Sequence, residues 1–420
     1  MNLSFADTLY FKKENILEII LGLHRSYKSL QREIQNCCEL NNLTDDNHSS
    51  IPIVILAGKS ALDLWLKKQP KRVKNWVLAS GFEANSGTTC LIANVSGNLE
   101  MVLGGAGDKK PVDLWWWSAI CNNLPEGNYR LDGCLDVEEA SQAALGWALA
   151  GYNFALYSSG KTEKSGPILV WPKNCDRQHV SRTVQSTFLV RDLINTPAND
   201  MGPSQLEDSA RSLAKKFNAK CRVIVGEELL EANFPAIHAV GRASVNAPRL
   251  IDIKWGKGTD PKVTLVGKGV CFDSGGLDLK SAAGMKLMKK DMGGAANVLG
   301  LATMIMDAVL PIQLRVLVPA VENSVSGNAM RPSDILTMRN GQTVEIGNTD
   351  AEGRLILADA LSAACEEDPK ILIDMATLTG AARIALGTDL PAFFCNDDSF
   401  AQDVEAHAKK QNDRHYNDRT

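Results

Sequence analysis

Short apolar runs alternate with amphipathic segments along the chain from residue 51 onward. Residues 51–56 form an apolar run of strand length, and an amphipathic stretch follows at 61–68. Short apolar runs bounded by turn residues are typical of strands, whereas apolar residues three or four positions apart are typical of helices. The same reasoning predicts strands at 88–95, 99–103 and 153–157 and a helix at 140–151. This alternation indicates an α/β domain.

The second half of the chain repeats the alternation. A polar connector at 172–181 precedes a predicted helix, and residues 205–217 place apolar side chains on one helical face. Predicted strands lie at 221–225, 250–255, 263–270, 314–320 and 371–376. Strands joined by helices in this way predict a mixed sheet covered by helices on both faces, with antiparallel strands allowed at its edges.

Composition narrows the function classes. Of the 420 residues 45% are hydrophobic and 22% are charged, as in a soluble globular protein. The net charge of −4 gives no electrostatic reason to expect a nucleic-acid partner. Because no apolar run is long enough to cross a bilayer, we expect no membrane association either. The ten cysteines form no CxxC pair and the apolar run at 16–21 is a poor secretory signal, so we expect reduced thiols and a cytoplasmic protein.

Two local patterns suggest ligand binding but have simpler explanations. Three consecutive tryptophans at 115–117 would suit stacking on a ligand, yet packing in a core or a subunit interface is the commoner use of such residues. Gly160-Lys161-Thr162 resembles the end of a phosphate-binding loop. That loop needs a glycine five positions before Gly160, where this chain has Ala155, so we reject a phosphate loop.

The most informative segment is the octapeptide at 348–355 (NTDAEGRL), which precedes an apolar run at 355–361. The run predicts a helix, so Asp350 and Glu352 lie at its N-terminal end, with Arg354 two positions further on. A structural alternative is that Asp350 caps the helix and Glu352 is favoured in its first turn by the helix dipole. A second cluster upstream favours a shared chemical role instead.

That second cluster occupies 266–280 (VGKGVCFDSGGLDLK) and 290–296 (KDMGGAA), where acids and lysines alternate with glycines. Taken singly, Asp273 suits a turn, Lys268 a solvated strand end and Asp291 a helix cap. Together with Asp350 and Glu352, the two aspartates provide the oxygen ligands that a hard divalent ion prefers, and a pair of ions needs a bridging carboxylate. The six histidines show no HExxH or similar spacing, which argues against a histidine zinc site.

In combination these segments resemble the leucine aminopeptidase (cytosol aminopeptidase) family of two-metal exopeptidases. Residues 195–203 (NTPANDMGP) resemble the entry into that family's catalytic domain. The resemblance is strong over 195–413 and weaker over 51–194. It implies an α/β fold with a smaller N-terminal α/β domain and a C-terminal catalytic domain.

The resemblance also implies a ligand set for two divalent ions. Asp273 and Glu352 would bridge the ions, Asp350 would complete one site, and Asp291 with Lys268 would complete the other. A lysine can serve as a ligand because two nearby dications lower its pKa until the neutral amine binds. Four carboxylates then balance two dications. Manganese and zinc are the expected ions, and magnesium suits such ligands as well.

Further roles follow from the resemblance alone. Lys280 would polarise the scissile carbonyl and stabilise the oxyanion, and Arg354 would hold a bicarbonate that acts as general base. Met288, Thr377 and Leu378 match positions that shape the side-chain pocket, although ordinary core packing is their alternative explanation. A water between the ions would be the nucleophile, and one ion would bind the free α-amine of the peptide.

We therefore expect a metal-dependent aminopeptidase that removes leucine and similar N-terminal residues from peptides, assembled as a homohexamer. The alternatives are a non-catalytic scaffold or inactive truncated relative, and an amidase or dipeptidase on the same scaffold. The expected division is an unmatched extension at 1–50, which ends in a polar loop or linker, an N-terminal domain at 51–175, a linker helix at 176–194, the catalytic domain at 195–413 and an aberrant tail at 414–420. Because family members continue further, we expect a catalytic domain that is incomplete at its C-terminus.

Overall fold

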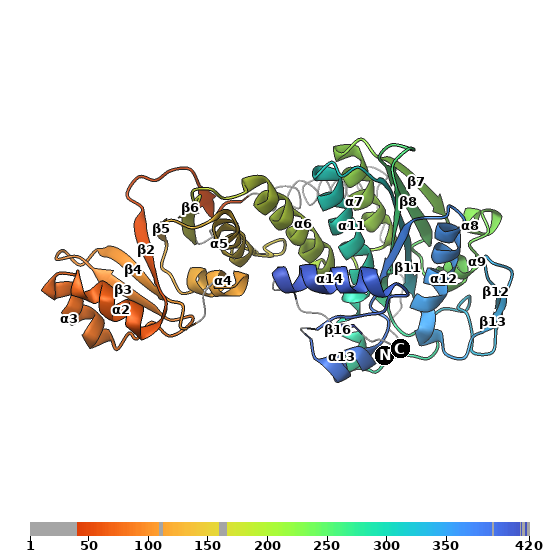
Figure 1. Ribbon diagram of the computed structural model, residues 1–420. Coiled ribbons are helices and arrows are strands. Elements are labelled where there is room, and N and C mark those ends of the chain that lie inside the picture. The colour runs from red at the N-terminus through yellow and green to blue at the C-terminus, as the bar shows by residue number, and fades with distance from the viewer. Residues whose placement is uncertain are drawn as a thin grey trace, which may run out of the picture.

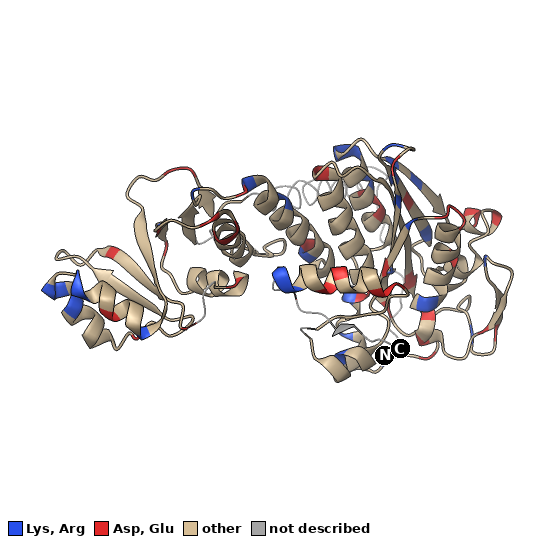
Figure 2. Ribbon diagram, in the orientation of Figure 1, with Lys and Arg blue, Asp and Glu red and all other residues tan. Residues whose placement is uncertain are grey.

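Two β-sheets lie at opposite ends of an elongated molecule and are joined by the long helix α6 (Arg177–Asn195), as Figure 1 shows. The computed structural model describes residues 40–108, 112–158, 166–388, 390–411, 413 and 416–417. Acidic and basic residues are interspersed over both ends of the molecule (Figure 2). No helix in these described ranges is both long and apolar enough to cross a bilayer.

The N-terminal sheet has six strands in the order β1-β6-β5-β2-β4-β3, all parallel except β3. Helices α4, α5 and α6 pack on one face, and α2 and α3 pack on the other. The strands are β1 (Leu43–Thr44), β2 (Ile51–Leu56), β3 (Thr89–Ala93), β4 (Leu99–Gly105), β5 (Gly127–Asp132) and β6 (Pro167–Val170), and the helices are α2 (Gly58–Lys67), α3 (Lys71–Ser80), α4 (Leu114–Asn122) and α5 (Val137–Ala150).

The tryptophans at 115–117 belong to α4 and divide between core and surface. Trp116 and Trp117 are buried and pack edge to face, and the Trp116 indole N–H donates to the carbonyl of Gly105 at 2.8 Å. Trp115 is 54% exposed. Core packing therefore explains two of the three side chains, as the sequence predicts.

Two local predictions for this half are wrong. Residues 153–157 form turns and irregular structure instead of a strand. Two tyrosines at the ends of this segment hydrogen-bond to the α6 region: the Tyr152 hydroxyl donates to Asp192 of α6, and the Tyr157 hydroxyl donates to Asp200, just beyond that helix. Conversely, Leu43–Thr44, within the segment expected to be a loop or linker, forms β1 and pairs with β6.

The outer edge of β3 is covered by two side chains from α3. The indole N–H of Trp76 donates to the carbonyl of Leu91 at 2.8 Å. Four residues earlier, Arg72 donates to the carbonyl of Ala93 and also pairs with Glu100. Two successive outward carbonyls of the edge strand are thus bonded within the chain.

The C-terminal sheet has the order β14-β9-β11-β8-β7, and β10 pairs with the end of β11. Strands β14, β9, β10 and β11 are parallel, whereas β8 is antiparallel to both of its neighbours. Helices α6, α7 and α11 pack on one face, and α9 and α12 pack on the other. The strands are β7 (Lys220–Val225), β8 (Arg249–Trp255), β9 (Lys262–Gly267), β10 (Gly269–Asp273), β11 (Gln313–Asn323) and β14 (Ile371–Met375), and the helices are α7 (Pro203–Lys216), α9 (Pro235–Gly241), α11 (Gly293–Asp307) and α12 (Glu352–Cys365). The predicted fold class is confirmed.

The remaining elements are short or peripheral. They are the paired strands β12 (Ile335–Thr337) and β13 (Thr343–Glu345), the paired strands β15 (Ala392–Phe393) and β16 (Tyr416–Asn417), helices α8 (Glu228–Glu231), α10 (Ala282–Met285), α13 (Gly380–Leu386) and α14 (Asp398–Lys410), and the 3-10 helices η1 (Met288–Met292) and η2 (Thr349–Ala351).

The strand predicted at 263–270 is interrupted at Lys268, which separates β9 from β10. The backbone of Lys268 hydrogen-bonds to a neighbouring strand and to a helix, because its N–H donates to Met375 of β14 at 3.0 Å and its carbonyl accepts from Ala295 of α11 at 2.9 Å. Parallel strands present their carboxyl ends at one edge of a sheet, where loops gather functional groups. Here that edge brings Lys268, Asn323 and the residues after Met375 together.

Candidate metal centre

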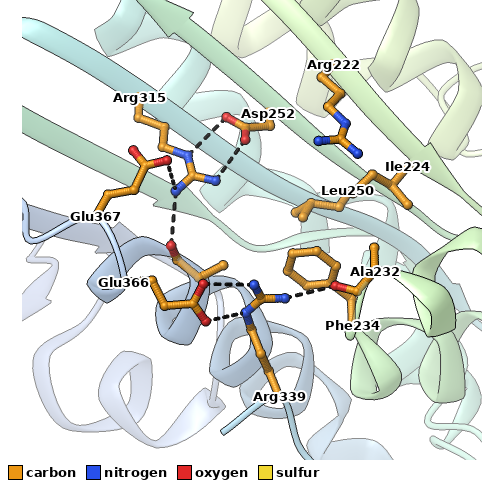
Figure 3. Close-up of a pocket in the computed structure, with 11 residues that line it drawn as sticks. Arg222, Ile224, Ala232, Phe234, Leu250, Asp252, Arg315, Arg339, Glu366 and Glu367 are labelled. Atoms are coloured by element: carbon orange, nitrogen blue, oxygen red, sulfur yellow. Dashed lines mark hydrogen bonds and ion pairs between the residues drawn. The ribbon is translucent and has the colours of Figure 1, made fainter. Parts of the chain in front are cut away.

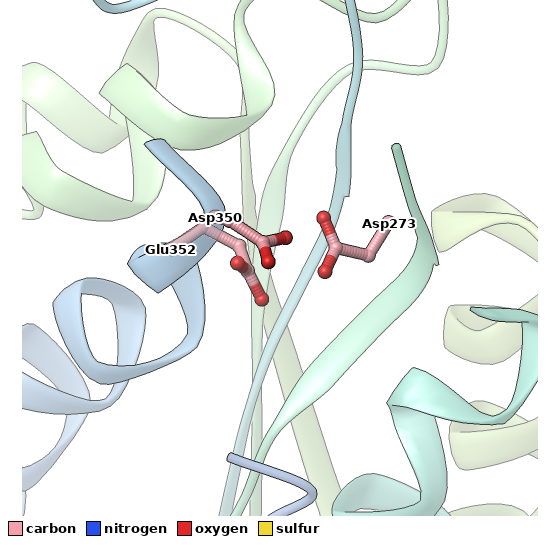
Figure 4. A group of neighbouring side chains, drawn as sticks. All are labelled: Asp273, Asp350 and Glu352. Carbon is pink, nitrogen blue, oxygen red and sulfur yellow. The ribbon is translucent and has the colours of Figure 1, made fainter. Parts of the chain in front are cut away.

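The acids singled out in the sequence converge at the carboxyl edge of the C-terminal sheet. Asp350 and Glu352 point from the start of α12 toward Asp273 at the end of β10 (Figure 4). One ligand oxygen from each of these three residues lies within 4.8 Å of the others. Asp350 is in the 3-10 turn η2, and Glu352 is the first residue of α12. The predicted placement of both acids at a helix N-terminus is confirmed.

Lys268 lies at the centre of a second group of acids. Its ammonium nitrogen is 2.9 Å from Asp291 Oδ2 and 2.9 Å from Glu352 Oε1, and it donates to the carbonyl of Thr377 at 2.9 Å. Lys268, Asp291 and Glu352 are 1–3% exposed. Asp291 is carried by η1, so this group joins four segments that are far apart in the sequence.

Lys280 bridges the acids of the first group. Its ammonium nitrogen is 2.8 Å from Asp273 Oδ2 and 2.5 Å from Asp350 Oδ1. Its side chain is 16% exposed, and that of Asp350 is 35% exposed, whereas Asp273 is buried. The first group is therefore the side of the site that solvent can reach.

The hydrogen bonds separate two kinds of carboxylate oxygen. Asp273 Oδ1 accepts from the backbone N–H of Gly275 at 2.8 Å and from Asn323 at 2.9 Å, and Asp291 Oδ1 accepts from the Thr377 hydroxyl at 2.7 Å. The other oxygen of each aspartate contacts only a lysine ammonium among the described residues. Neutral donors thus hold one oxygen, and the other faces a cation.

Glu352 accepts no hydrogen bond from a neutral donor of any described residue. Among the described residues, Oε1 contacts the Lys268 ammonium and Oε2 has no hydrogen-bond partner. A buried carboxylate oxygen without a donor is costly unless a charge or a metal compensates it. Both oxygens of Glu352 are thus available to bind cations.

The charge balance fits additional cations. Four carboxylates, Asp273, Asp291, Asp350 and Glu352, surround two ammonium groups, which leaves a net charge of −2 in a largely buried site. The pKa of Glu352 is raised, chiefly by burial and further by Asp273 and Asp291. Burial acts to lower the pKa of Lys268, but Asp291 and Glu352 outweigh it and raise that pKa above its ordinary value. The donor set therefore fits divalent metal ions.

Gly353 allows Lys268 to lie against the start of α12. A Cβ atom at this position would lie 2.3 Å from Lys268 Cε and 2.6 Å from its Nζ. Nonbonded atoms cannot approach that closely, so any side chain at 353 would displace the lysine. The motif glycine between Glu352 and Arg354 thus has a steric reason.

Sequence reasoning missed three residues that hold the loops of this site together. Asn323 is 2% exposed at the end of β11 and bonds to Asp273 and to the carbonyl of Thr349. The Thr349 hydroxyl donates to the carbonyl of Gly275 at 2.7 Å and accepts from the backbone N–H of Asp278 at 2.8 Å. The Asp278 carboxylate accepts from the Thr349 backbone at 2.6 Å. A polar residue that ends an apolar strand was the available signal for Asn323.

The remaining expected residues surround the acids in different ways. Thr377 bonds to Asp291 and Lys268 through its hydroxyl and carbonyl, so it contacts the candidate metal ligands directly. Met288 begins η1 and is partly buried, and Leu378 is 46% exposed. Arg354 is exposed and has no hydrogen bond or ion pair within the described part of the chain. Its guanidinium is available to an anion.

A separate cavity of about 310 Å³ lies away from these acids, near the start of β11 and the end of α12 (Figure 3). Its charged lining is mostly paired, because Arg315 pairs with Asp252 at 2.8 Å and Arg339 pairs with Glu366 at 2.8 Å. Arg339 also stacks on the Phe234 ring. This cavity contains none of the candidate ligands. Arg315 of β11 also pairs at 3.2 Å with Glu367, just after α12, which ties the end of that helix to the sheet.

Comparison with known proteins agrees with this geometry. The family model "Cytosol aminopeptidase family, catalytic domain" matches residues 188–417, and "M17 aminopeptidase, N-terminal domain" matches residues 51–170. The chain belongs to the cytosol aminopeptidase family. The resemblance inferred from the motifs at 266–280, 290–296 and 348–355 is thereby confirmed.

Curated relatives align with part of this cytosol aminopeptidase family member. A probable cytosol aminopeptidase of Xanthomonas axonopodis pv. citri is 45% identical over 234 residues, which are 55% of this chain and 48% of the relative. The chain thus spans about half the length of the curated relatives that it matches in this way.

Solved structures extend the match to both domains. The crystal structure of a cytosol aminopeptidase from Coxiella burnetii has a TM-score of 0.84 and 46% identity, and covers 91% of this chain and 82% of its own. The bottromycin maturation enzyme BotP in complex with Mn has a TM-score of 0.76 and 31% identity, with coverage of 88% and 81%.

Proposed function

We propose that this chain is a metal-dependent aminopeptidase that hydrolyses the N-terminal residue, leucine and similar, from peptides. The observation that carries the proposal is the buried cluster of carboxylates whose cation-facing oxygens lack neutral donors. The names of its relatives support peptidase chemistry, and the manganese complex of BotP supports a metal at such a site.

Two ions, manganese or zinc, are proposed to be held by five side chains. Asp273, Asp350 and Glu352 would hold one ion, and Lys268 and Asp291 would complete the site of the other, with Asp273 and Glu352 shared. When bound, the ions would supply Lewis acidity and lower the pKa of the attacking water between them. A free peptide amine as ligand would restrict cleavage to N-termini.

The chain's own residues would bind and orient the peptide. Lys280 lies at the accessible side of the acids, where its ammonium can donate to the scissile carbonyl and stabilise negative charge on that oxygen. Arg354 is exposed and unpaired among the described residues, which suits retention of a bicarbonate that accepts a proton. Met288, Thr377 and Leu378 are proposed to shape the side-chain pocket.

Organisation and location are proposals as well. We infer the domain division at 51–175, 176–194 and 195–413, a homohexameric assembly and a cytoplasmic location, the last because relatives carry the name cytosol aminopeptidase. Light scattering coupled to size-exclusion chromatography tests the assembly, since a monomeric mass would contradict it.

The decisive experiment is hydrolysis of leucine amide by the purified 420-residue chain with and without added Mn²⁺ or Zn²⁺. We expect metal-dependent release of leucine, its loss in Asp350→Ala and Glu352→Ala, and no cleavage of acetyl-leucine amide. Full activity in both variants would contradict the proposed site. Cleavage of the acetylated substrate would favour an amidase.

A folded chain that binds metal but releases no leucine from any amide or peptide would favour the non-catalytic alternative. Circular dichroism and a Mn²⁺ titration on the same sample distinguish that outcome from failure to fold.

A further inference from the structure

Asn323 is the neutral side chain that lies between the two acid-bearing loops. It is the last residue of β11, it is 2% exposed, and it is the register partner of Asp273 where β10 and β11 pair in parallel. Its backbone carbonyl accepts from the N–H and the hydroxyl of Ser274 at 3.0 and 2.8 Å. The end of β11 thus holds the residue that follows Asp273 as well.

Both amide hydrogens of Asn323 have acceptors in different loops. The amide nitrogen donates to Asp273 Oδ1 at 2.9 Å and to the backbone carbonyl of Thr349 at 3.1 Å. Because both partners are acceptors, the amide can have only this orientation. Thr349 directly precedes Asp350, so one side chain ties Asp273 to the loop that carries the next acid.

The bond from Asn323 determines which oxygen of Asp273 remains available. Asp273 Oδ1 also accepts from the Gly275 N–H at 2.8 Å, so two donors occupy this oxygen. The other oxygen, Oδ2, is then directed toward Lys280 at 2.8 Å and toward the remaining acids. An amide does this without neutralising the carboxylate, whereas a cationic donor would compete with a bound ion.

We propose that Asn323 is a positioning residue of the metal centre, which sets the spacing between Asp273 and the Asp350–Glu352 loop so that their free oxygens meet at one ion. The proposal rests on the proposed function only as far as ion binding. It predicts that loss of the amide weakens ion binding more than it weakens the fold, because outer partners of metal ligands typically affect affinity 10–100-fold.

The experiment compares two variants with a matched control. Asn323→Ala removes the amide, and Asn323→Leu removes both donors while keeping the same branching and number of side-chain heavy atoms. The control is Asn246→Ala, because the Asn246 amide donates to the carboxylate of Glu322, the preceding residue of β11, at 2.9 Å. The control therefore loses the same kind of bond away from the candidate centre.

Affinity for Mn²⁺ is measured by the loss of the free-ion electron paramagnetic resonance signal, and the site's geometry by the visible spectrum of the Co²⁺-loaded protein. We expect both Asn323 variants to bind Mn²⁺ about 10–100-fold more weakly, with an altered Co²⁺ spectrum. We expect wild-type values for Asn246→Ala. Thermal unfolding in chelator shows whether each variant folds. If Asn323→Ala does not fold, the Mn²⁺ affinity of Asn323→Leu decides the test.

Wild-type Mn²⁺ affinity and an unchanged Co²⁺ spectrum in folded Asn323→Leu would overturn the proposal, even if its melting temperature in chelator were lower. Such a result would assign Asn323 a purely structural role. If the wild type bound Mn²⁺ but released no leucine, only the proposed function would fail. If the wild type bound no divalent ion, both would fail.

Discussion

Replacing Gly353 with alanine should change the geometry of the site more than it changes the stability of the fold. The added Cβ would lie 2.3 Å from Lys268 Cε, so the end of the lysine side chain must move. Overpacking of this kind costs about 1–3 kcal/mol, and alanine in place of glycine in a helix returns up to about 1 kcal/mol. The net loss of stability should therefore be about 0–3 kcal/mol.

Metal binding should suffer more than stability in Gly353→Ala. The Lys268 ammonium has three oxygen partners at 2.9 Å, from Asp291, Glu352 and Thr377, and its displacement misplaces two proposed ligands together with the lysine. We expect Mn²⁺ affinity to fall at least about tenfold, as found when metal ligands lose their supporting contacts.

The assay is Mn²⁺ titration together with urea unfolding in chelator. The matched control is Gly380→Ala, because Gly380 is the first residue of α13 and a Cβ there would have no atom within 4 Å. Wild-type affinity in Gly353→Ala would refute the steric argument. An equal loss in Gly380→Ala would show that the effect is not specific to Lys268.

Three other perturbations test separate parts of the structure. Burial raises the pKa of Asp192 to about 6, although the Tyr152 hydroxyl donates a hydrogen bond to it. A raised carboxyl pKa means that the charged form destabilises the folded state. This destabilisation is fully present above pH 6 and absent below pH 4. At pH 8 the free energy of unfolding of Asp192→Asn should therefore exceed that of the wild type by up to about 3 kcal/mol, and the difference should vanish near pH 4. Equal free energies of unfolding at pH 8 would contradict this. Thr377→Val removes the hydroxyl that donates to Asp291 at 2.7 Å and should weaken Mn²⁺ binding. The control Thr379→Val changes the N-cap of α13 and should leave Mn²⁺ binding unchanged. Calorimetric titration measures the Mn²⁺ affinity of both variants. Chelation should lower the melting temperature of the wild type, because the centre without ions has a net charge of −2, and an unchanged melting temperature would argue against bound ions.

The fold class could be predicted because burial of a sheet on both faces leaves a direct trace in the sequence. The apolar strands that became β9 and β11 are examples, and their bounds lie close to the predicted ones apart from the break that ends β9. The break at Lys268 was not visible, because it depends on bonds to Met375 and Ala295, which are distant in sequence. The strand predicted at 153–157 was wrong for a similar reason, since Tyr152 and Tyr157 hydrogen-bond to partners on or just beyond α6, which are distant in sequence.

The acids of the site could be predicted from residue type and spacing, but their supporting partners could not. Asp350 and Glu352 are close in sequence to a helix start, which is a local signal. Asn323 acts on Asp273 across 50 positions, and its bond exists only because β10 and β11 pair in register. The one local signal, a polar residue that ends an apolar strand, does not show which acid Asn323 contacts.

The capped edge of β3 has a consequence for how copies of this protein can meet. An uncovered edge strand is a template on which another chain can add a strand and begin to aggregate. Trp76 and Arg72 bond to two successive carbonyls on that edge, and the opposite edge strand β1 is only two residues long. Within the described residues, neither border of the N-terminal sheet offers a long, fully open backbone ladder to a neighbouring chain. Contacts between copies along these borders should therefore depend on side chains, whose chemistry can favour one partner, rather than on backbone hydrogen bonds, which any chain can form.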